Sequence, residues 1–173
     1  MISVDIKSLL ARLNPYCTRS LENAAGLCVS RTHYEVTVEH MIAKLIDDLQ
    51  ADIPLILKHF EIDTGKVAGV LEKTLEEFRT GNAAKPVFSP LLMEWIQESY
   101  LVGSVDFGEK KIRSGMLLKT LLKNPGRFGS GSYLEHFYQI GNDALQADFW
   151  QVIKESVETP AAGEAADTGV EPM

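Results

Sequence analysis

The feature that most constrains the fold is an internal repeat, in which the stretches beginning at Asn14-Pro15 and Ser89-Pro90 carry one helical pattern 75 positions apart. The matched pairs keep this register: Pro15 with Pro90, Leu21 with Ile96, Ala24 with Ser99, Leu27 with Val102, Met41 with Met116, Ile42 with Leu117, and Ile46 with Leu121. Chance matches between unrelated amphipathic segments drift by one or two positions every turn. The sequence therefore predicts an all-α fold made of a duplicated helical unit.

Composition narrows the function classes. The chain has 173 residues, 45% of them hydrophobic, which suffices for one packed domain. Its net charge of −7 and its scattered Lys and Arg residues argue against nucleic acid as a partner, because phosphates require clustered cations. We interpret the nearest basic cluster, Lys110, Lys111 and Arg113, as a solvated helix face. Without a long apolar run or a signal-peptide pattern, we expect a soluble cytoplasmic protein that does not bind membranes.

Cysteine use agrees with a reducing compartment. Cys17 and Cys28 are the only two cysteines, and both fall within one predicted helix. Eleven residues apart on a helix they are separated by roughly 16 Å, which is too far for a disulfide. Each is therefore expected to be a small core residue.

Helix-start signals and apolar spacing divide the chain into segments. We expect a short amphipathic helix at about 4–13, followed by helices at 15–30, from Thr37, at 52–60 and after Asp63. The second half repeats this order with helices at 90–104, at 108–122 and after a capping Asn142, whose residues Leu145, Phe149, Trp150 and Ile153 should face inward. The second half also has two or three extra residues in its Gly- and Ser-rich loop, and no segment has a clear strand pattern.

The domain boundaries follow from this order. We expect one domain over residues 1–157, with an extra helix at about 4–13, repeat one at about 14–82 and repeat two at about 89–156. From 158 to 173 the sequence is rich in Ala, Gly, Pro and acidic residues and has almost no apolar side chains. Such a segment cannot bury enough surface to offset ordering entropy, so it is predicted to be a flexible linker.

Patterns for catalysis are weak. His33, Glu39 and His40 lack the i, i+4 spacing of a zinc pair on one helix, and no third ligand is evident. Cys17 has no histidine placed beside it in the sequence, although a small hydrolase using Cys17 or a metal at the histidines stays an alternative. Thr64-Gly65-Lys66 is followed by Val67 where a P-loop needs Ser or Thr, so we expect this chain not to be an enzyme. A binding surface is the remaining interpretation, because grooves between packed helices accept amphipathic partner helices.

One set of residues resembles a known family, the amino-terminal (Clp N) domains of the Clp/Hsp100 AAA+ unfoldases. The resemblance rests on the duplicated four-helix unit, on the acidic linker and on the pattern that enters a helix at His33, Val38, Glu39, His40 and Met41. It implies a pseudo-twofold arrangement of the two repeats. The second half has Ser114-Gly115-Met116 where the family carries a motif similar to Glu-His-Leu-Leu. The family's ATPase modules, which bind ATP and Mg and form a hexameric ring, would follow the linker.

The amino-terminal region is similar to one branch of this family, the ClpV (TssH) unfoldases that disassemble contracted type VI secretion sheaths. The similarity covers about 155 residues and is most specific over 10–25. General Clp relatives start near the equivalent of the helix at 15–30, whereas here the extra helix at about 4–13 precedes that helix. It implies a monomeric docking domain, without a cofactor of its own, that binds an amphipathic amino-terminal helix of the large sheath subunit in a hydrophobic groove. The alternative is the amino-terminal domain of a general Clp unfoldase that binds an adaptor or a misfolded protein.

The groove residues are chosen from this implication and from the number of apolar side chains at two places, the extra helix and the start of repeat two. Ten residues need fewer apolar anchors than the extra helix offers, and Leu91 and Leu92 cannot both face inward. The expected groove residues are Ile6, Leu9, Leu10, Leu13, Phe88, Leu91, Leu92 and Trp95.

Overall fold

The computed structural model describes residues 5–108 and 110–160, and this part of the chain is mainly helical. The helices are α1 (Ile6–Leu10), α2 (Pro15–Ser30), α3 (Val38–Leu45), α4 (Asp52–His59), α5 (Thr64–Glu76), α6 (Pro90–Phe107), α7 (Ser114–Lys123), α8 (Pro125–Phe128), α9 (Leu134–Phe137) and α10 (Asn142–Val152). Two short strands, β1 (Glu35–Val36) and β2 (Val87–Phe88), were not expected from the sequence. The all-α prediction is confirmed, with these strands as a local addition.

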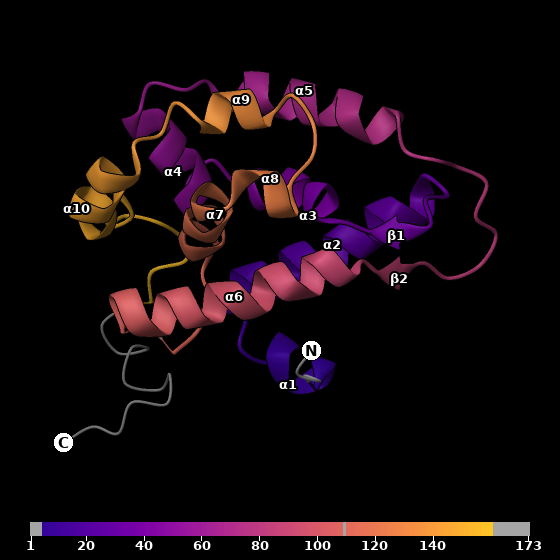
Figure 1. Cartoon of the computed structure of the whole chain (residues 1–173), viewed down its shortest axis with the longest axis horizontal. Helices are drawn as coiled ribbons and strands as arrows, with labels where there is room; N and C mark the ends of the chain where they lie inside the picture. Colours follow the sequence, from indigo (N-terminus) through magenta and orange to yellow (C-terminus); the bar gives the residue numbers. More distant parts are fainter. Residues whose placement is uncertain (1–4, 109, 161–173) are drawn as a thin grey trace.

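The two repeats follow the same order of helices. In the first, α2 packs against α3, and α3 and α4 pack against α5; in the second, α6 packs against α7, which contacts α10. Between α7 and α10, where no helix was expected from the sequence, the short helices α8 and α9 lie on either side of the Gly- and Ser-rich loop. Figure 1 shows α5 and α9 along one edge of the molecule and α1 at the opposite edge, with α10 beside α4.

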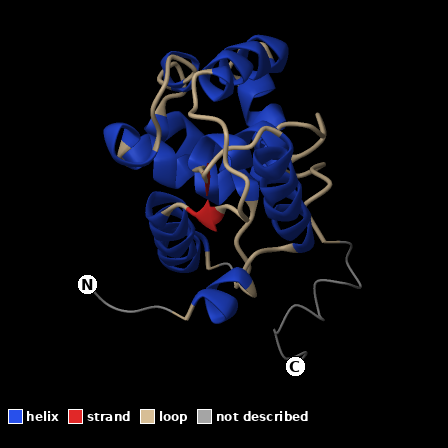
Figure 2. Cartoon of the chain, turned by 90° about the vertical axis from the view of Figure 1, so that its right-hand side faces the viewer, coloured by secondary structure: helices blue, strands red, loops and turns tan. Residues whose placement is uncertain are grey.

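Two backbone contacts show how the repeats are related by a pseudo-twofold. The Ser89 amide, just before α6, donates to the Val36 carbonyl at 2.9 Å. The Asn14 amide, just before α2, donates to the Ile112 carbonyl at the same distance. Each repeat therefore offers the segment before its first helix to the segment before the second helix of the other. Both contacts are parallel: the first is the pairing of β1 with β2, and the second is an isolated bridge between Leu13 and Ile112. The paired strands are drawn in red near the middle of Figure 2.

One hydrophobic core spans both repeats. Cys17 and Cys28 are fully buried free thiols in α2, which confirms that they are core residues. Trp95 of α6 is also fully buried, and its indole Nε1–H donates to the Leu117 carbonyl at 2.9 Å. Trp150 was expected to face inward, but 45% of its surface is exposed.

Capping side chains explain where half of the described helices begin. The Asn14 side-chain oxygen accepts from the Cys17 amide at 2.8 Å, and Thr37 and Asp63 cap α3 and α5, as expected. Asn142 does not cap α10, because it is the first helical residue and Gly141 occupies the capping position. The first and seventh helices are shorter than predicted, at five and ten residues.

The carboxyl end of the domain extends beyond the expected boundary at 157. Glu158 is only 8% exposed and accepts hydrogen bonds from residues of both repeats, and the preceding amide of Val157 donates to the Gln50 carbonyl. Glu158 was expected to begin the linker because it is acidic and near an Ala- and Gly-rich run, but its carboxyl group is a buried acceptor. Residues 161–173 of the expected linker lie outside the described residues.

Candidate functional site

A groove of about 400 Å³ lies between α1, α2 and the segment that leads into β2. Most of its lining side chains are apolar, and α2 presents them on one face, spaced three or four residues apart. The lining residues are Leu10, Leu13, Thr18, Leu21, Glu22, Ala25, Val29, Val36, Lys85, Pro86 and Phe88. An open apolar trough beside a helix is the surface that an amphipathic helix can fill.

Three of the residues predicted from the sequence meet in this groove. Leu10 and Leu13 lie at its α1 end, and Phe88 of β2 lies on the opposite wall. These positions are far apart in sequence, and the pairing of β2 with β1 brings them together. Phe88 keeps 36% of its surface exposed, so its ring is available to a partner.

The other five predicted residues do not line the groove. Ile6 and Leu91 are exposed, at 50% and 43%, on α1 and α6 respectively. Leu9, Leu92 and Trp95 are core residues, with Leu92 and Trp95 fully buried. The assignment of these three residues to a binding surface is corrected: α6 turns Leu92 and Trp95 toward α7 and the core, and Leu9 is the side chain by which α1 joins the core.

Sequence reasoning missed the α2 wall. Residues Leu21, Ala25 and Val29 follow each other at intervals of four, and Val29 is 57% exposed. The core face of α2 is carried by neighbouring residues such as Ala24 and Cys28, which are fully buried. A second apolar stripe on the same helix was the available signal for the groove.

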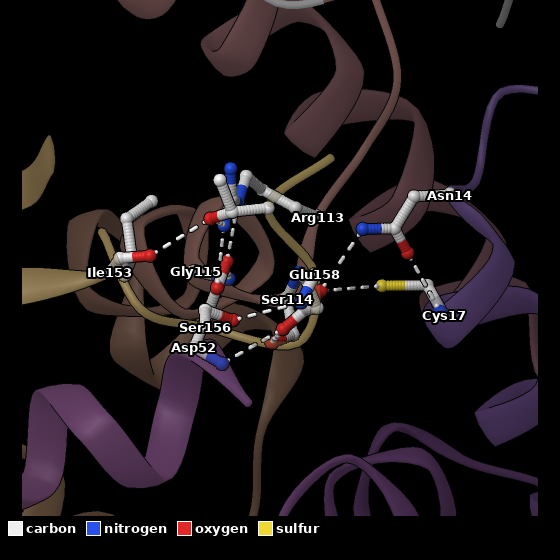
Figure 3. A network of polar contacts seen from close by, with 10 residues as sticks. Asn14, Cys17, Asp52, Arg113, Ser114, Gly115, Ile153, Ser156 and Glu158 are labelled. Atoms are coloured by element: carbon white, nitrogen blue, oxygen red, sulfur yellow. Dashed lines mark hydrogen bonds and ion pairs between the residues drawn. The ribbon is translucent and has the colours of Figure 1, made fainter. Parts of the chain in front are cut away.

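A second feature is a buried polar network at the base of α4 and α7, drawn in Figure 3. The Arg113 guanidinium donates to both oxygens of the Asp52 carboxylate, from Nε at 2.7 Å and from a terminal nitrogen at 2.9 Å. Asp52 is fully buried, and Arg113 is 4% exposed. The expectation that Arg113 belongs to a solvated basic face is therefore wrong. A two-pronged ion pair of this kind fixes the start of α7 against the start of α4.

Glu158 completes the network from the carboxyl end of the domain (Figure 3). One of its oxygens accepts from the Asn14 side chain at 3.1 Å and from the Ser114 amide at 2.7 Å. The other accepts from the Asp52 amide at 2.9 Å and from the Ser114 hydroxyl at 2.5 Å. The carboxyl group thus satisfies backbone donors that α4 and α7 leave unpaired at their first turns.

Burial dominates the electrostatics of this network. Burial and, after it, the nearby Asp52 charge together raise the pKa of the Glu158 carboxyl to about 7, although the hydrogen bonds from Ser114 and Asp52 oppose the shift. Burial likewise raises the pKa of the Cys17 thiol well above its ordinary value, with Glu158 adding to the effect. A thiol held protonated in this way is a poor nucleophile.

The corresponding place in repeat one holds two histidines and a glutamate. The Thr37 amide donates to His40 Nδ1 at 3.0 Å, so the His40 proton lies on Nε2 and is donated to His33 Nδ1 at 2.8 Å. Burial first, and then the charges of His33 and Arg31, together lower the pKa of His40 to about 4. Glu39 accepts from the Ser130 amide at 3.1 Å and from the Tyr133 hydroxyl.

These contacts explain the residues that looked like chemistry in the sequence. Within residues 5–108 and 110–160, His, Cys, Asp and Glu side chains form no group of three or more that could hold a metal ion. Thr64-Gly65-Lys66 is the first turn of α5, where the Asp63 side chain caps the Gly65 amide at 2.8 Å. Every helix in the described part is too short or too polar to cross a bilayer.

Comparison with known proteins identifies the fold. No family model matches the chain. Among curated proteins, the AAA+ ATPase ClpV1 of Pseudomonas aeruginosa is 24% identical over 174 aligned residues, which include 99% of this chain. The chain spans 19% of the length of that relative.

Two solved structures place the chain more closely. The N-domain of ClpV from Vibrio cholerae superposes with a TM-score of 0.85 at 31% identity, over 92% of this chain and 95% of that one. A complex of a ClpV N-domain with a VipB peptide superposes at 0.82 with 30% identity, over 92% and 98% of the two chains. Together with the duplicated helical unit and the extra helix α1, this likeness shows that the chain belongs to the family of ClpV N-domains.

Proposed function

We propose that this chain is the substrate-recognition domain of a type VI secretion unfoldase, and that it binds an amino-terminal helix of the large sheath subunit in the groove along α2. The observation that carries the proposal is the groove itself, where Leu10, Leu13 and Phe88 converge beside the apolar stripe of α2. A related ClpV N-domain has been solved with a VipB peptide, which supports peptide binding as the role.

The groove suits a transient contact. If a partner helix buried on the order of 600 Å² of apolar area, the gross gain would be about 15 kcal/mol. Ordering and association would offset around half of this, which leaves micromolar affinity. Weak binding fits a role in which an ATPase ring, formed by modules that would follow this domain, receives the sheath subunit and extracts it from contracted sheaths in the cytoplasm.

The test is a titration of a labelled peptide from the amino-terminal helix of the large sheath subunit, followed by fluorescence anisotropy. Val29→Glu and Phe88→Glu place a charge on opposite walls of the groove and should each weaken binding at least tenfold. Leu101→Glu is the matched control, because Leu101 is 55% exposed on α6 and does not line the groove. Circular dichroism of each variant checks that helicity is retained.

Two outcomes would decide against the proposal. If both groove variants bind the peptide as the unmodified domain does, the partner occupies another surface. If a scrambled amphipathic helix of equal hydrophobicity binds as tightly as the sheath peptide, the domain is a general Clp-type receptor for an adaptor or misfolded protein.

A further inference from the structure

Among the side chains that line the groove, two are charged, and they have opposite signs. Glu22 projects from the α2 wall, and Lys85 lies on the other wall in the segment that leads into β2. In the described part of the chain, neither forms an ion pair or a side-chain hydrogen bond with another residue.

The two charges occupy different places along the groove. The groove face of α2 runs from Thr18 to Val29, about 16 Å at 1.5 Å per residue, which is the length of three helical turns. Glu22 lies one turn from the Thr18 end. Lys85 belongs to the loop beside the carboxyl end of α2, since the neighbouring Asn82 amide donates to the Thr32 carbonyl. The charges are therefore on opposite walls and offset along the groove axis.

Resting on the proposed function, we infer that Glu22 and Lys85 select the partner helix by charge. The partner is an amphipathic helix of about three turns with a basic residue on one flank of its apolar stripe and an acidic residue on the other, about two turns apart. The basic residue pairs with Glu22 and the acidic residue with Lys85. Apolar contacts supply affinity, and the two rim charges supply register and direction, as is common at partly exposed interfaces.

The probes are four synthetic helical peptides with an identical apolar stripe. They differ only at the two flanking sites, which carry Arg and Glu, Arg and Arg, Glu and Glu, or Gln and Gln. The unmodified domain should bind the Arg/Glu peptide about two- to fivefold more tightly per matched contact than either like-charged peptide at low salt. The preference should disappear in 0.5 M NaCl, because rim charges are screened.

Charge reversal on the protein gives the decisive comparison. Glu22→Lys should shift the preference to the Glu/Glu peptide, and Lys85→Glu should shift it to the Arg/Arg peptide. The Gln/Gln peptide should bind all three proteins alike. Arg19→Glu is the control, since Arg19 is an exposed α2 residue outside the groove lining.

The outcomes separate this inference from the proposed function. Suppose that the Gln/Gln peptide binds the unmodified domain and that Val29→Glu weakens this binding, but that the charged peptides show no preference or no reversal. Selection by Glu22 and Lys85 is then wrong, and the proposed binding groove is retained. If none of the four peptides binds, or if Val29→Glu leaves binding unchanged, the groove assignment fails and the inference fails with it.

Discussion

The two repeats differ in where the polar groups come from that satisfy the first backbone amides of their second helix, α3 or α7. In repeat one the polar groups come from the first turn of α3 itself, where Thr37 and His40 form a capping box. In repeat two the corresponding turn carries Ser114 and Gly115, and the polar groups arrive from Asp52 and Glu158. Local sequence thus suffices to begin α3, whereas α7 depends on segments 44 and 63 residues away.

The largest expected effect comes from breaking the ion pair that supports α7. Arg113→Ala leaves the fully buried Asp52 carboxylate without its counter-charge, and we expect a loss of about 3–5 kcal/mol in the free energy of unfolding. Urea unfolding followed by circular dichroism measures it. Arg127→Ala is the control, because Arg127 is exposed and its pairs with Glu94 and Glu98 should contribute less than about 1 kcal/mol. Equal losses of unfolding free energy in the two variants would show that the buried ion pair stabilises the domain no more than an exposed pair does.

A smaller effect should follow from adding one methyl group at Gly115. A Cβ there would lie 2.9 Å from a ring carbon of Phe149 and 3.0 Å from an Asp52 oxygen, so Gly115→Ala should destabilise by about 1–3 kcal/mol. Gly26→Ala in α2 is the opposite case, since nothing lies within 4 Å of its Cβ, and it should stabilise by about 0.5–1 kcal/mol. Thermal unfolding of both variants checks the pair. A neutral Gly115→Ala would mean that Phe149 and Asp52 can shift to admit a methyl group at the start of α7.

Removal of the cap in repeat one tests local dependence. Thr37→Ala deletes the oxygen that accepts from the His40 amide, and a cap of this kind contributes about 1 kcal/mol. Asn142→Ala provides the comparison in repeat two, because Asn142 does not cap α10 and its bond to the Leu122 carbonyl is long, at 3.5 Å. We expect a loss below about 0.5 kcal/mol for Asn142→Ala. Chemical denaturation that ranks Asn142 above Thr37 would contradict the cap assignments.

The smallest net effect is the pH dependence, because the lowered pKa of His40 and the raised pKa of Glu158 act on stability in opposite directions. His40 has a pKa of about 4 when folded and 6.5 in its ordinary state, so the unfolded chain binds more protons between these values and stability falls as pH drops through them. Glu158 has a folded pKa of about 7 against 4.5, so its contribution is complete below pH 4.5 and is lost as pH rises to 7.

Two variants isolate these contributions. In His40→Gln, the rise in the free energy of unfolding between pH 4 and 6.5 that His40 causes should be absent. In Glu158→Gln, the fall in the free energy of unfolding between pH 4.5 and 7 that Glu158 causes should be absent. Urea midpoints at half-unit pH steps would show the two difference curves with opposite slopes. Parallel curves would contradict the opposite pKa shifts of His40 and Glu158.

The sequence predicted what local patterns determine. The caps at Asn14, Thr37 and Asp63 and the burial of both cysteines need only spacing and side-chain chemistry, and the structure confirms them. The groove was predicted in part, since Leu10, Leu13 and Phe88 line it and the α2 stripe was overlooked.

What the sequence did not predict depends on long-range contacts. Leu92 and Leu91 look alike in sequence, and only the packing of α6 against α7 decides which is buried. Arg113 looked solvated because its partner Asp52 is 61 residues away. The pairing of β1 with β2 joins segments that are also distant along the chain, so no local pattern announced it.

The position of Glu158 also gives the domain a mechanical property. Tension applied to the backbone at Thr159 is resisted first by the Glu158 carboxyl bonds and by the bond from Arg113 to the Thr159 hydroxyl, at 2.8 Å. The load then divides among the first turns of α4 and α7 and, through Asn14, the start of α2. Since α2 is also a wall of the groove, a single hydrogen bond from Asn14 to Glu158 joins the carboxyl-terminal segment to the helix that lines the proposed binding surface.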